Sequence, residues 1–212
     1  MSYADIVFKN MCQDILDNGC DTKGEKVRPH WEDGTPAYTI KRFGVVNRYN
    51  LAEEFPALTL RKTGFKSCVD EILWIWQKKS NNIHDLNSHI WDSWADETGS
   101  IKRAYGYQLA RKYAHHKFNY KFNYNKETIE QLQKEYPSAE LRFDDAYGCY
   151  FVMLDQVDGV IYDLRNNPYS RRIMTNIYNF DDLYDMALYP CAYSMTFNVT
   201  KKPGHDKLIL NG

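Results

Sequence analysis

The segment from Thr63 to Lys78 places the strongest constraint on the fold. Its apolar side chains recur at the three- and four-residue spacing of an α-helix, at Phe65, Cys68, Val69, Ile72, Leu73 and Trp76. Trp74 and Ile75 widen this surface until almost no polar face remains. A helix that is apolar nearly all round needs other elements around it. We therefore expect a buried central helix, and 212 residues are enough to build a core around one.

The other periodicities predict an α+β fold. A four-residue repeat from Tyr3 to Ile15 predicts a first helix that ends at Asn18-Gly19. Further predicted helices are Glu127–Tyr136, Asp181–Ala187 and one capped by Asp155 with Val157, Val160, Ile161 and Leu164 inward. Predicted strands are Thr39–Tyr49, Arg172–Tyr178, Ala192–Val199 and Lys207–Leu210. Because these elements do not alternate as βαβ units, their order favours an α+β fold around a mixed sheet.

The whole chain, 1–212, is interpreted as one domain with a small inserted subdomain at about 110–155. Within that stretch KFNYKFNY (Lys117 to Tyr124) forms a short tandem repeat. Its lysines and aromatic rings superficially resemble a platform for single-stranded nucleic acid. The chain carries 27 basic and 28 acidic residues, and this balance argues against nucleic acid as a partner.

Composition also restricts the compartment and the metal chemistry. Five cysteines with no CxxC spacing argue against a disulfide framework or a structural zinc site. The six histidines have no ligand-like spacing beyond the adjacent His115-His116, so we expect no metal. Without a signal-peptide pattern or a membrane-length apolar run, the expected location is cytoplasmic.

Two residues are candidates for covalent and proton-transfer chemistry. Cys191 follows Pro190 where a short helix meets a strand, a fixed and reachable place for a nucleophile; the alternative is a small buried hydrophobe. Glu71 lies on the nearly apolar helix, where desolvation would raise its pKa and make it a proton donor. The alternative for Glu71 is an ordinary pair with a lysine.

Arginines and tryptophans are candidates for binding. Arg171 and Arg172 are adjacent and suit bidentate capture of a phosphate, although paired arginines are also common on surfaces. Arg28 is a weaker candidate of the same kind. Trp91 and Trp94 could stack on a flat heterocycle, but they could equally be core residues.

Taken together and in order, these segments resemble the thymidylate synthase family. The matching stretches are EEFPALTLRKTGFKSCVDEILWIW (Glu53 to Trp76), HIWDSWAD (His89 to Asp96), AYGYQL (Ala104 to Leu109), DLRNNPYSRR (Asp163 to Arg172) and YNFDDLYDMALYPC (Tyr178 to Cys191). They cover nearly the whole chain outside the insertion.

The resemblance implies reductive methylation of dUMP to dTMP, with 5,10-methylenetetrahydrofolate as donor of the carbon and the hydride. Cys191 would add to C6 of the uracil ring and make C5 nucleophilic. Glu71 would move protons at O4 through water, Tyr105 would help remove the C5 proton, and Asn179 would organise the cysteine and the ring.

Binding residues and assembly are also implied by the resemblance. Arg28 would bind the nucleotide phosphate, and Arg171 and Arg172 would reach across a homodimer interface to the partner's phosphate. The folate pocket would be lined by Ile90, Trp91 and Trp94. The implied fold is a large mixed sheet with helices on one face, the other face forming the homodimer interface.

The sequence departs from the family pattern at several places. The family usually has histidine and glutamine where this chain has Ala192 and Thr196. Tyr178 stands where tryptophan is usual, and Gly64 where many members have a folate-contacting histidine. The family's segment that recognises the pyrimidine would follow Gly212, so we expect this chain to be the amino-terminal part.

Two other functions fit the same motifs. A pyrimidine-nucleotide hydroxymethylase would share the fold, the cysteine and the folate, with water replacing hydride. A non-catalytic fragment acting as an interaction module is the second alternative.

Overall fold

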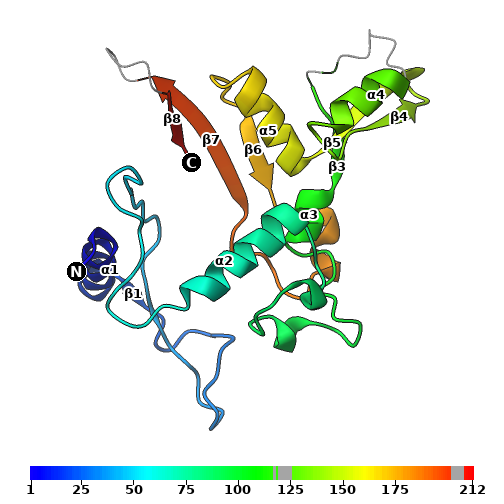
Figure 1. The fold of residues 1–212 in the computed structure, drawn as a ribbon. Coiled ribbons are helices and arrows are strands. Elements are labelled where there is room, and N and C mark those ends of the chain that lie inside the picture. The colour runs from blue at the N-terminus through cyan, green and yellow to red at the C-terminus, as the bar shows by residue number, and fades with distance from the viewer. Residues whose placement is uncertain (117, 119–125, 202–207) are drawn as a thin grey trace. The chain divides into compact units, whose positions relative to one another are not determined.

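The computed structural model describes residues 1–116, 118, 126–201 and 208–212 (Figure 1). The chain divides into two compact units, Met1–Phe65 and Lys66–Gly212, called here the first and second units. The subdomain boundaries expected at about 110–155 remain a prediction. The tandem repeat, apart from Phe118, lies outside the described residues.

Helix α1 (Tyr3–Asn18) dominates the first unit and confirms the first predicted helix. Ser2 begins it with a capping box, in which its hydroxyl accepts from Asp5 N–H while the Asp5 carboxylate accepts from Ser2 N–H. Asp5 is fully buried and also accepts from the Thr59 backbone N–H at 2.7 Å. This one carboxylate therefore ties the start of α1 to residues far along the chain.

The predicted strand Thr39–Tyr49 is wrong for most of its length. Only β2 (Ile40–Lys41) forms, pairing antiparallel with β1 (Cys20–Asp21). The remaining residues have strand composition but no second strand to pair with among those the structure describes, and a strand without ladder partners leaves its backbone groups to other contacts.

The helix of the apolar segment is present but is not buried. It consists of α2 (Phe65–Leu73), which has no buried residue, followed by a π-helical turn, Trp74–Lys78. Only Trp74 and Ile75 enter the core, together with Ile101, Leu109 and other apolar residues. The apolar pattern indicates that the surface of α2 is suited to burial, but the described residues leave most of that surface uncovered.

The segment between 112 and 155 builds a small sheet with its own core. Its antiparallel strands lie in the order β3-β5-β4, with helix α4 beside them (Figure 1). These elements are β3 (Lys112–Ala114), α4 (Lys126–Gln133), β4 (Glu140–Asp144) and β5 (Cys149–Asp155). Tyr136, Ala139 and Leu154 form the buried cluster. The predicted helix at Glu127 is confirmed.

The remaining strands form another antiparallel sheet in the order β6-β7-β8. Helix α5 lies beside β6 and is capped by Asp155, as the sequence predicts (Figure 1). The bounds are α3 (Gly106–Ala110), α5 (Gln156–Asn166), β6 (Ile173–Asn176), β7 (Ser194–Lys201), β8 (Leu208–Asn211) and 3-10 turns at Ile83–Asp85, Asp92–Trp94 and Phe180–Asp185. The fold class is α+β. Pairing among the described strands is antiparallel in three small sheets, not a single mixed one.

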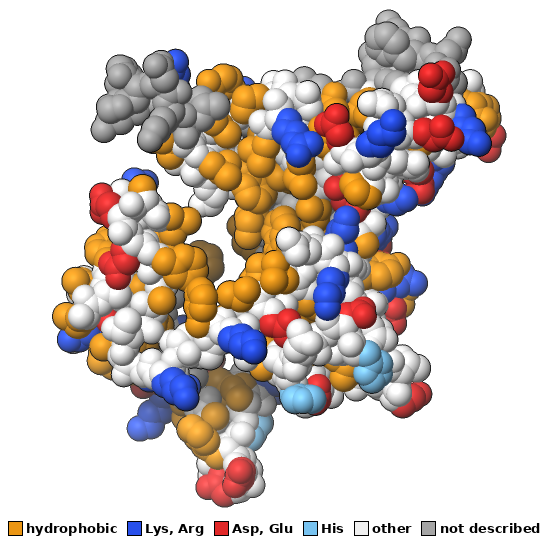
Figure 2. Space-filling model, viewed as in Figure 1, with side chains coloured by type: hydrophobic (Ala, Val, Ile, Leu, Met, Phe, Trp, Pro, Cys, Tyr) orange, Lys and Arg blue, Asp and Glu red, His pale blue; other side chains and the backbone are white. Residues whose placement is uncertain are grey.

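Large apolar side chains remain exposed on the second unit. Figure 2 shows hydrophobic side chains gathered over β6 and β7, where Met174 and Met195 are exposed.

Among the described residues, the helices are all too short or too polar to span a membrane.

Candidate active site

Cys191 and Tyr105 meet although they are far apart in sequence. The backbone N–H of Cys191 donates to the Tyr105 hydroxyl at 3.3 Å. Pro190 is buried, whereas Cys191 itself is exposed. The cysteine precedes β7 by three residues, so it lies in the approach to the strand and not at its first position. It is thus held by its neighbours and open to a ligand, as a nucleophile requires.

An unusual backbone conformation positions Tyr105. Its φ of 43° falls in the left-handed region, which a side chain other than glycine adopts at a cost. The next residue, Gly106, lies so close to the preceding chain that a Cβ atom there would be 2.1 Å from the Ser80 carbonyl oxygen. The close approach of α3 to Ser80 therefore requires this glycine.

The environment of Tyr105 keeps its hydroxyl protonated. Burial raises the pKa of Tyr105 above its ordinary value; the Cys191 N–H opposes this shift, and the nearby Cys191 and Glu71 groups add to it. A neutral phenol beside the thiol can hold or pass a proton without placing a second negative charge there.

Glu71 joins this group through Trp91. The Trp91 indole N–H donates to the Glu71 carboxylate at 2.8 Å, and the Trp91 and Tyr105 rings meet edge to face with centroids 5.1 Å apart. Glu71 is half-buried, which is less desolvation than the sequence predicts. The second unit thus brings together Glu71, Trp91, Tyr105 and Cys191.

The predicted folate-pocket residues separate into two kinds. Trp91 is 8% exposed and packs against Trp74 in the core, whereas Ile90 and Trp94 are each 48% exposed. The two surface residues are available to a ligand. Trp91 acts on the site through its indole N–H and its ring contacts.

Asn179 belongs to a different polar network, centred on the buried carboxylate of Asp182. The Asn179 amide donates to Asp182 at 2.9 Å, and the Gln108 amide donates to it at 2.8 Å. Arg103 donates at 2.8 Å, and Arg111 also forms an ion pair with this carboxylate. Burial alone would raise the pKa of Asp182, but the bonds from Gln108 and the two arginines outweigh it and lower that pKa.

Sequence reasoning missed Gln108 and Asp182. Gln108 is 1% exposed, and Asp182 is 3% exposed. Both lie inside the motifs AYGYQL and YNFDDLYDMALYPC, so the motifs contain the signal. However, neither a glutamine nor one aspartate in a run of acidic residues stands out without the fold.

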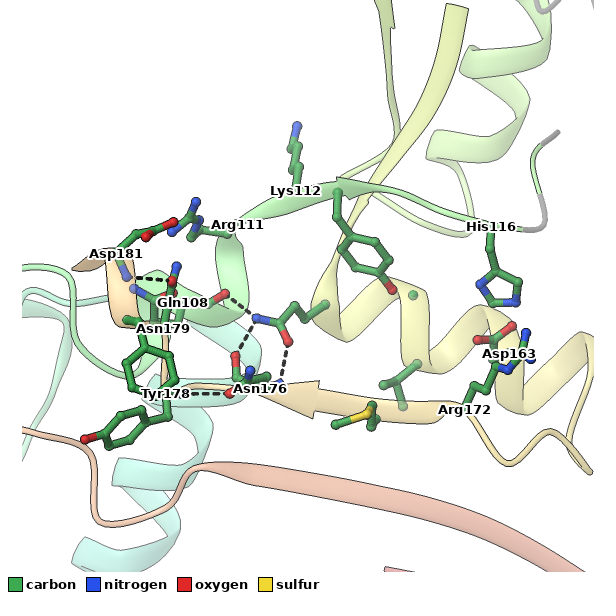
Figure 3. A pocket seen from close by; sticks show the side chains of 16 residues that line it. Gln108, Arg111, Lys112, His116, Asp163, Arg172, Asn176, Tyr178, Asn179 and Asp181 are labelled. Carbon is green, nitrogen blue, oxygen red and sulfur yellow. Dashed lines mark hydrogen bonds between the residues drawn. The ribbon is translucent and has the colours of Figure 1, made fainter. Parts of the chain in front are cut away.

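A cavity of about 790 Å³ lies beside this network (Figure 3). Asn179, Tyr178 and Arg172 are among its lining residues, with Gln108 and Asp163. Neither Glu71 nor Cys191 is among the described residues that line it, so this cavity is distinct from the Cys191 group.

The remaining predicted phosphate ligands are exposed. Arg171 precedes β6 on the surface of the second unit. Arg28 belongs to the first unit, where its side chain is also exposed.

The chain belongs to the thymidylate synthase family. The sequence profile described as thymidylate synthase matches residues 6–211. The thymidylate synthase of Bacillus subtilis subsp. natto is 36% identical over 214 aligned residues, and that of Bacillus phage phi3T is 35% identical over 209. The solved structure of thermostable thymidylate synthase A from Bacillus subtilis superposes with a TM-score of 0.72 at 34% identity.

These relatives are longer than the chain. The alignment with the natto protein covers 99% of this chain and 63% of the relative, and the solved structure gives the same shares. The phage protein is covered over 63% of its length and 97% of this chain.

Proposed function

We propose that the chain serves the reductive methylation of dUMP to dTMP, with 5,10-methylenetetrahydrofolate as co-substrate. Family membership supports the reaction. The observation that carries it is the convergence of an exposed cysteine, a buried tyrosine and a half-buried glutamate on one group of contacts. They supply the nucleophile and the two proton-transfer groups that the reaction needs.

Cys191 forms the covalent bond. Its thiolate adds to C6 of the uracil ring, and the ring electrons move so that C5 attacks the one-carbon unit of the folate. Product release then requires loss of the C5 proton, cleavage of the bond between the one-carbon unit and the folate nitrogen, and transfer of a hydride from tetrahydrofolate to the exocyclic methylene. As the hydride adds, the carbon–sulfur bond breaks and its electron pair returns to sulfur. An exposed thiol next to a fixed backbone suits both steps.

Proton movements fall to Tyr105 and Glu71. Tyr105 helps water to remove the C5 proton, since its hydroxyl stays neutral beside Cys191. Glu71, oriented by the indole of Trp91, exchanges protons at O4 through water. Asn179, whose amide donates to the buried Asp182 carboxylate, helps to organise the cysteine and the ring.

The substrate phosphate is assigned to Arg28, Arg171 and Arg172, with Arg171 and Arg172 acting on the partner's site in a cytoplasmic homodimer. All three are exposed, as donors to a phosphate or across an interface must be. Ile90 and Trp94 offer exposed apolar surface for the folate ring, beside the buried Trp91.

Covalent trapping tests the proposal. The complete protein is incubated with 5-fluoro-dUMP and methylenetetrahydrofolate, and the adduct is mapped by mass spectrometry. We expect an adduct on Cys191 that depends on both ligands. Labelling of another cysteine, or none at all, would reject the assignment. Product analysis with dUMP then separates 5-methyl from 5-hydroxymethyl nucleotide.

A further inference from the structure

Two histidines and an aspartate converge beside the cavity described above. His115 and His116 follow β3, and Asp163 lies on α5. One potential ligand atom from each lies within 4.8 Å of the other two. Figure 3 shows the His116 ring directed toward Asp163. This grouping has no place in the proposed methylation reaction.

Gly159 explains why the two elements approach so closely. A Cβ atom on Gly159 would lie 2.0 Å from the Tyr113 hydroxyl oxygen and 3.4 Å from the His115 ring. Asp163 is four residues further along the same helix, and therefore on the same face. The bare face at Gly159 lets β3 pack onto α5 and places His115 opposite Asp163.

The spacing between His115 and Asp163 fits a shared ion. Nε2 of His115 is 3.5 Å from Oδ2 of Asp163, beyond the 2.7–3.2 Å typical of an N–H···O hydrogen bond. Bonds of about 2.0–2.1 Å at tetrahedral angles separate two zinc ligands by roughly 3.4 Å. The pair is thus already spaced as two ligands of one metal.

A second observation points in the same direction. Asp163 is 4% exposed, and its other oxygen, Oδ1, is buried without a hydrogen-bond partner among the described residues. A buried carboxylate oxygen with no partner is costly unless a ligand satisfies it. His115, 2% exposed, is held in place by ring contacts with Tyr162 and Phe118. The site therefore has two fixed donors.

We propose that His115, His116 and Asp163 bind a divalent transition-metal ion such as Zn²⁺. Two imidazoles and one carboxylate form a donor set that such ions prefer. His116 is exposed, so its ring can move the short distance needed to complete the site. Both His116 and Asp163 line the cavity, and the fourth coordination position is therefore left to water or another ligand there.

Metal titration of the purified, metal-free protein tests this site. Zn²⁺ is titrated against a chromophoric chelator, and Co²⁺ is followed by its visible absorption. We expect one saturable equivalent whose affinity falls at least tenfold in His116→Ala. Asp163→Asn should weaken binding similarly, and circular dichroism reports whether that variant folds. The His116 variant has an exposed side chain replaced, so it keeps the test valid if Asp163→Asn does not fold.

Control variants separate this site from other metal ligands. His89→Ala removes an exposed histidine that also pairs with an aspartate, and Cys191→Ser removes the exposed thiol. Neither should change the first equivalent, and the Co²⁺ spectrum should lack the intense band of a thiolate ligand. Absence of saturable binding, or binding that survives in His116→Ala, would overturn the proposal.

Discussion

The indole N–H of Trp91 donates to the carboxylate of Glu71 across 2.8 Å. The contact links α2 to a turn twenty residues further on, and Trp91 also touches Tyr105. A core tryptophan therefore orients the candidate proton-transfer group. Trp91 thus contributes ring packing against Tyr105 and a hydrogen bond to Glu71, and a substitution can remove the second while keeping most of the first.

Trp91→Phe should separate those effects. Phenylalanine keeps most of the ring packing but removes the donor, so the free energy of unfolding should fall by about 2 kcal/mol, as for lost bonds to charged groups. Turnover should fall as well, because Glu71 loses its orientation. Urea denaturation and steady-state kinetics measure the two effects. The control is Trp94→Phe, at the exposed tryptophan of the same motif. It should change the free energy of unfolding by less than about 0.5 kcal/mol. Equal losses of stability from the two variants would contradict the hydrogen-bonding role assigned to Trp91.

In the complete protein, Cys191→Ser should abolish dTMP formation while the fold remains intact. A serine hydroxyl is a far weaker nucleophile than a thiolate, so kcat should fall about a thousandfold or more. Radiometric or chromatographic assay of dTMP measures this loss, and circular dichroism checks the fold. Cys20→Ser, at another exposed cysteine, should retain normal turnover. Substantial residual activity in the Cys191 variant would remove it from the mechanism.

Arg171→Ala should raise the KM for dUMP, and mixing should rescue the deficit. If Arg171 acts on the partner's phosphate, a heterodimer of Arg171→Ala with Cys191→Ser contains one site with both a cysteine and a donated arginine. Activity after subunit exchange, compared with each variant alone, measures the rescue. No recovery despite proven exchange would argue that each subunit supplies its own arginine.

Asp182→Asn should be strongly destabilising. The change leaves Arg103 and Arg111 without their shared buried carboxylate. We expect a loss of about 3 kcal/mol, at the low end for broken buried pairs because both guanidinium groups keep access to water. Urea midpoints measure it. Asp181→Asn, at the adjacent exposed residue, is the matched control and should be close to neutral. A neutral Asp182 variant would show that the network is not structural.

Asp5 should make stability sensitive to acid. Hydrogen bonds from Thr59 and Ser2 outweigh burial and lower the pKa of Asp5 from 3.8 to about 2. The folded state thus favours the carboxylate, and its contribution is complete above about pH 4 and lost as the pH falls toward 2. Asp5→Asn should flatten the dependence of the urea midpoint on pH over this range. Asp17→Asn, on the exposed side of α1, should leave it unchanged.

Local periodicity predicted the elements that carry their own signals. The four-residue repeat before Asn18-Gly19 located α1, and Asp155 located the start of α5. The alternation near Val199 located β7, although the strand begins at Ser194 and not Ala192. Thr39–Tyr49 failed because composition measures suitability for a sheet, while strand formation depends on a neighbour that local sequence does not specify.

The candidate site was predictable in its residues but not in its connections. Motifs identified Cys191, Glu71 and Tyr105, because each residue type has a chemical role. They did not reveal that Trp91 bonds to Glu71 or that Asn179 is committed to Asp182. The first bond joins residues twenty positions apart, and in the second Asn179 and Gln108 donate to the same carboxylate. Only the folded structure shows such contacts.

The π-helical turn at Trp74–Lys78 determines how the protein responds to the loss of one residue at this point. A π turn contains one more residue than the α turn it replaces, so the residues before and after it keep nearly the angular relation they would have in an α-helix. Deleting one residue here would therefore restore regular α winding and leave Lys79 on nearly the same face, close to the Asp155 carboxylate that it reaches at 2.5 Å. A single-codon deletion in this turn should therefore destabilise the protein less than a deletion within α2, where removing one residue rotates everything that follows by about 100°.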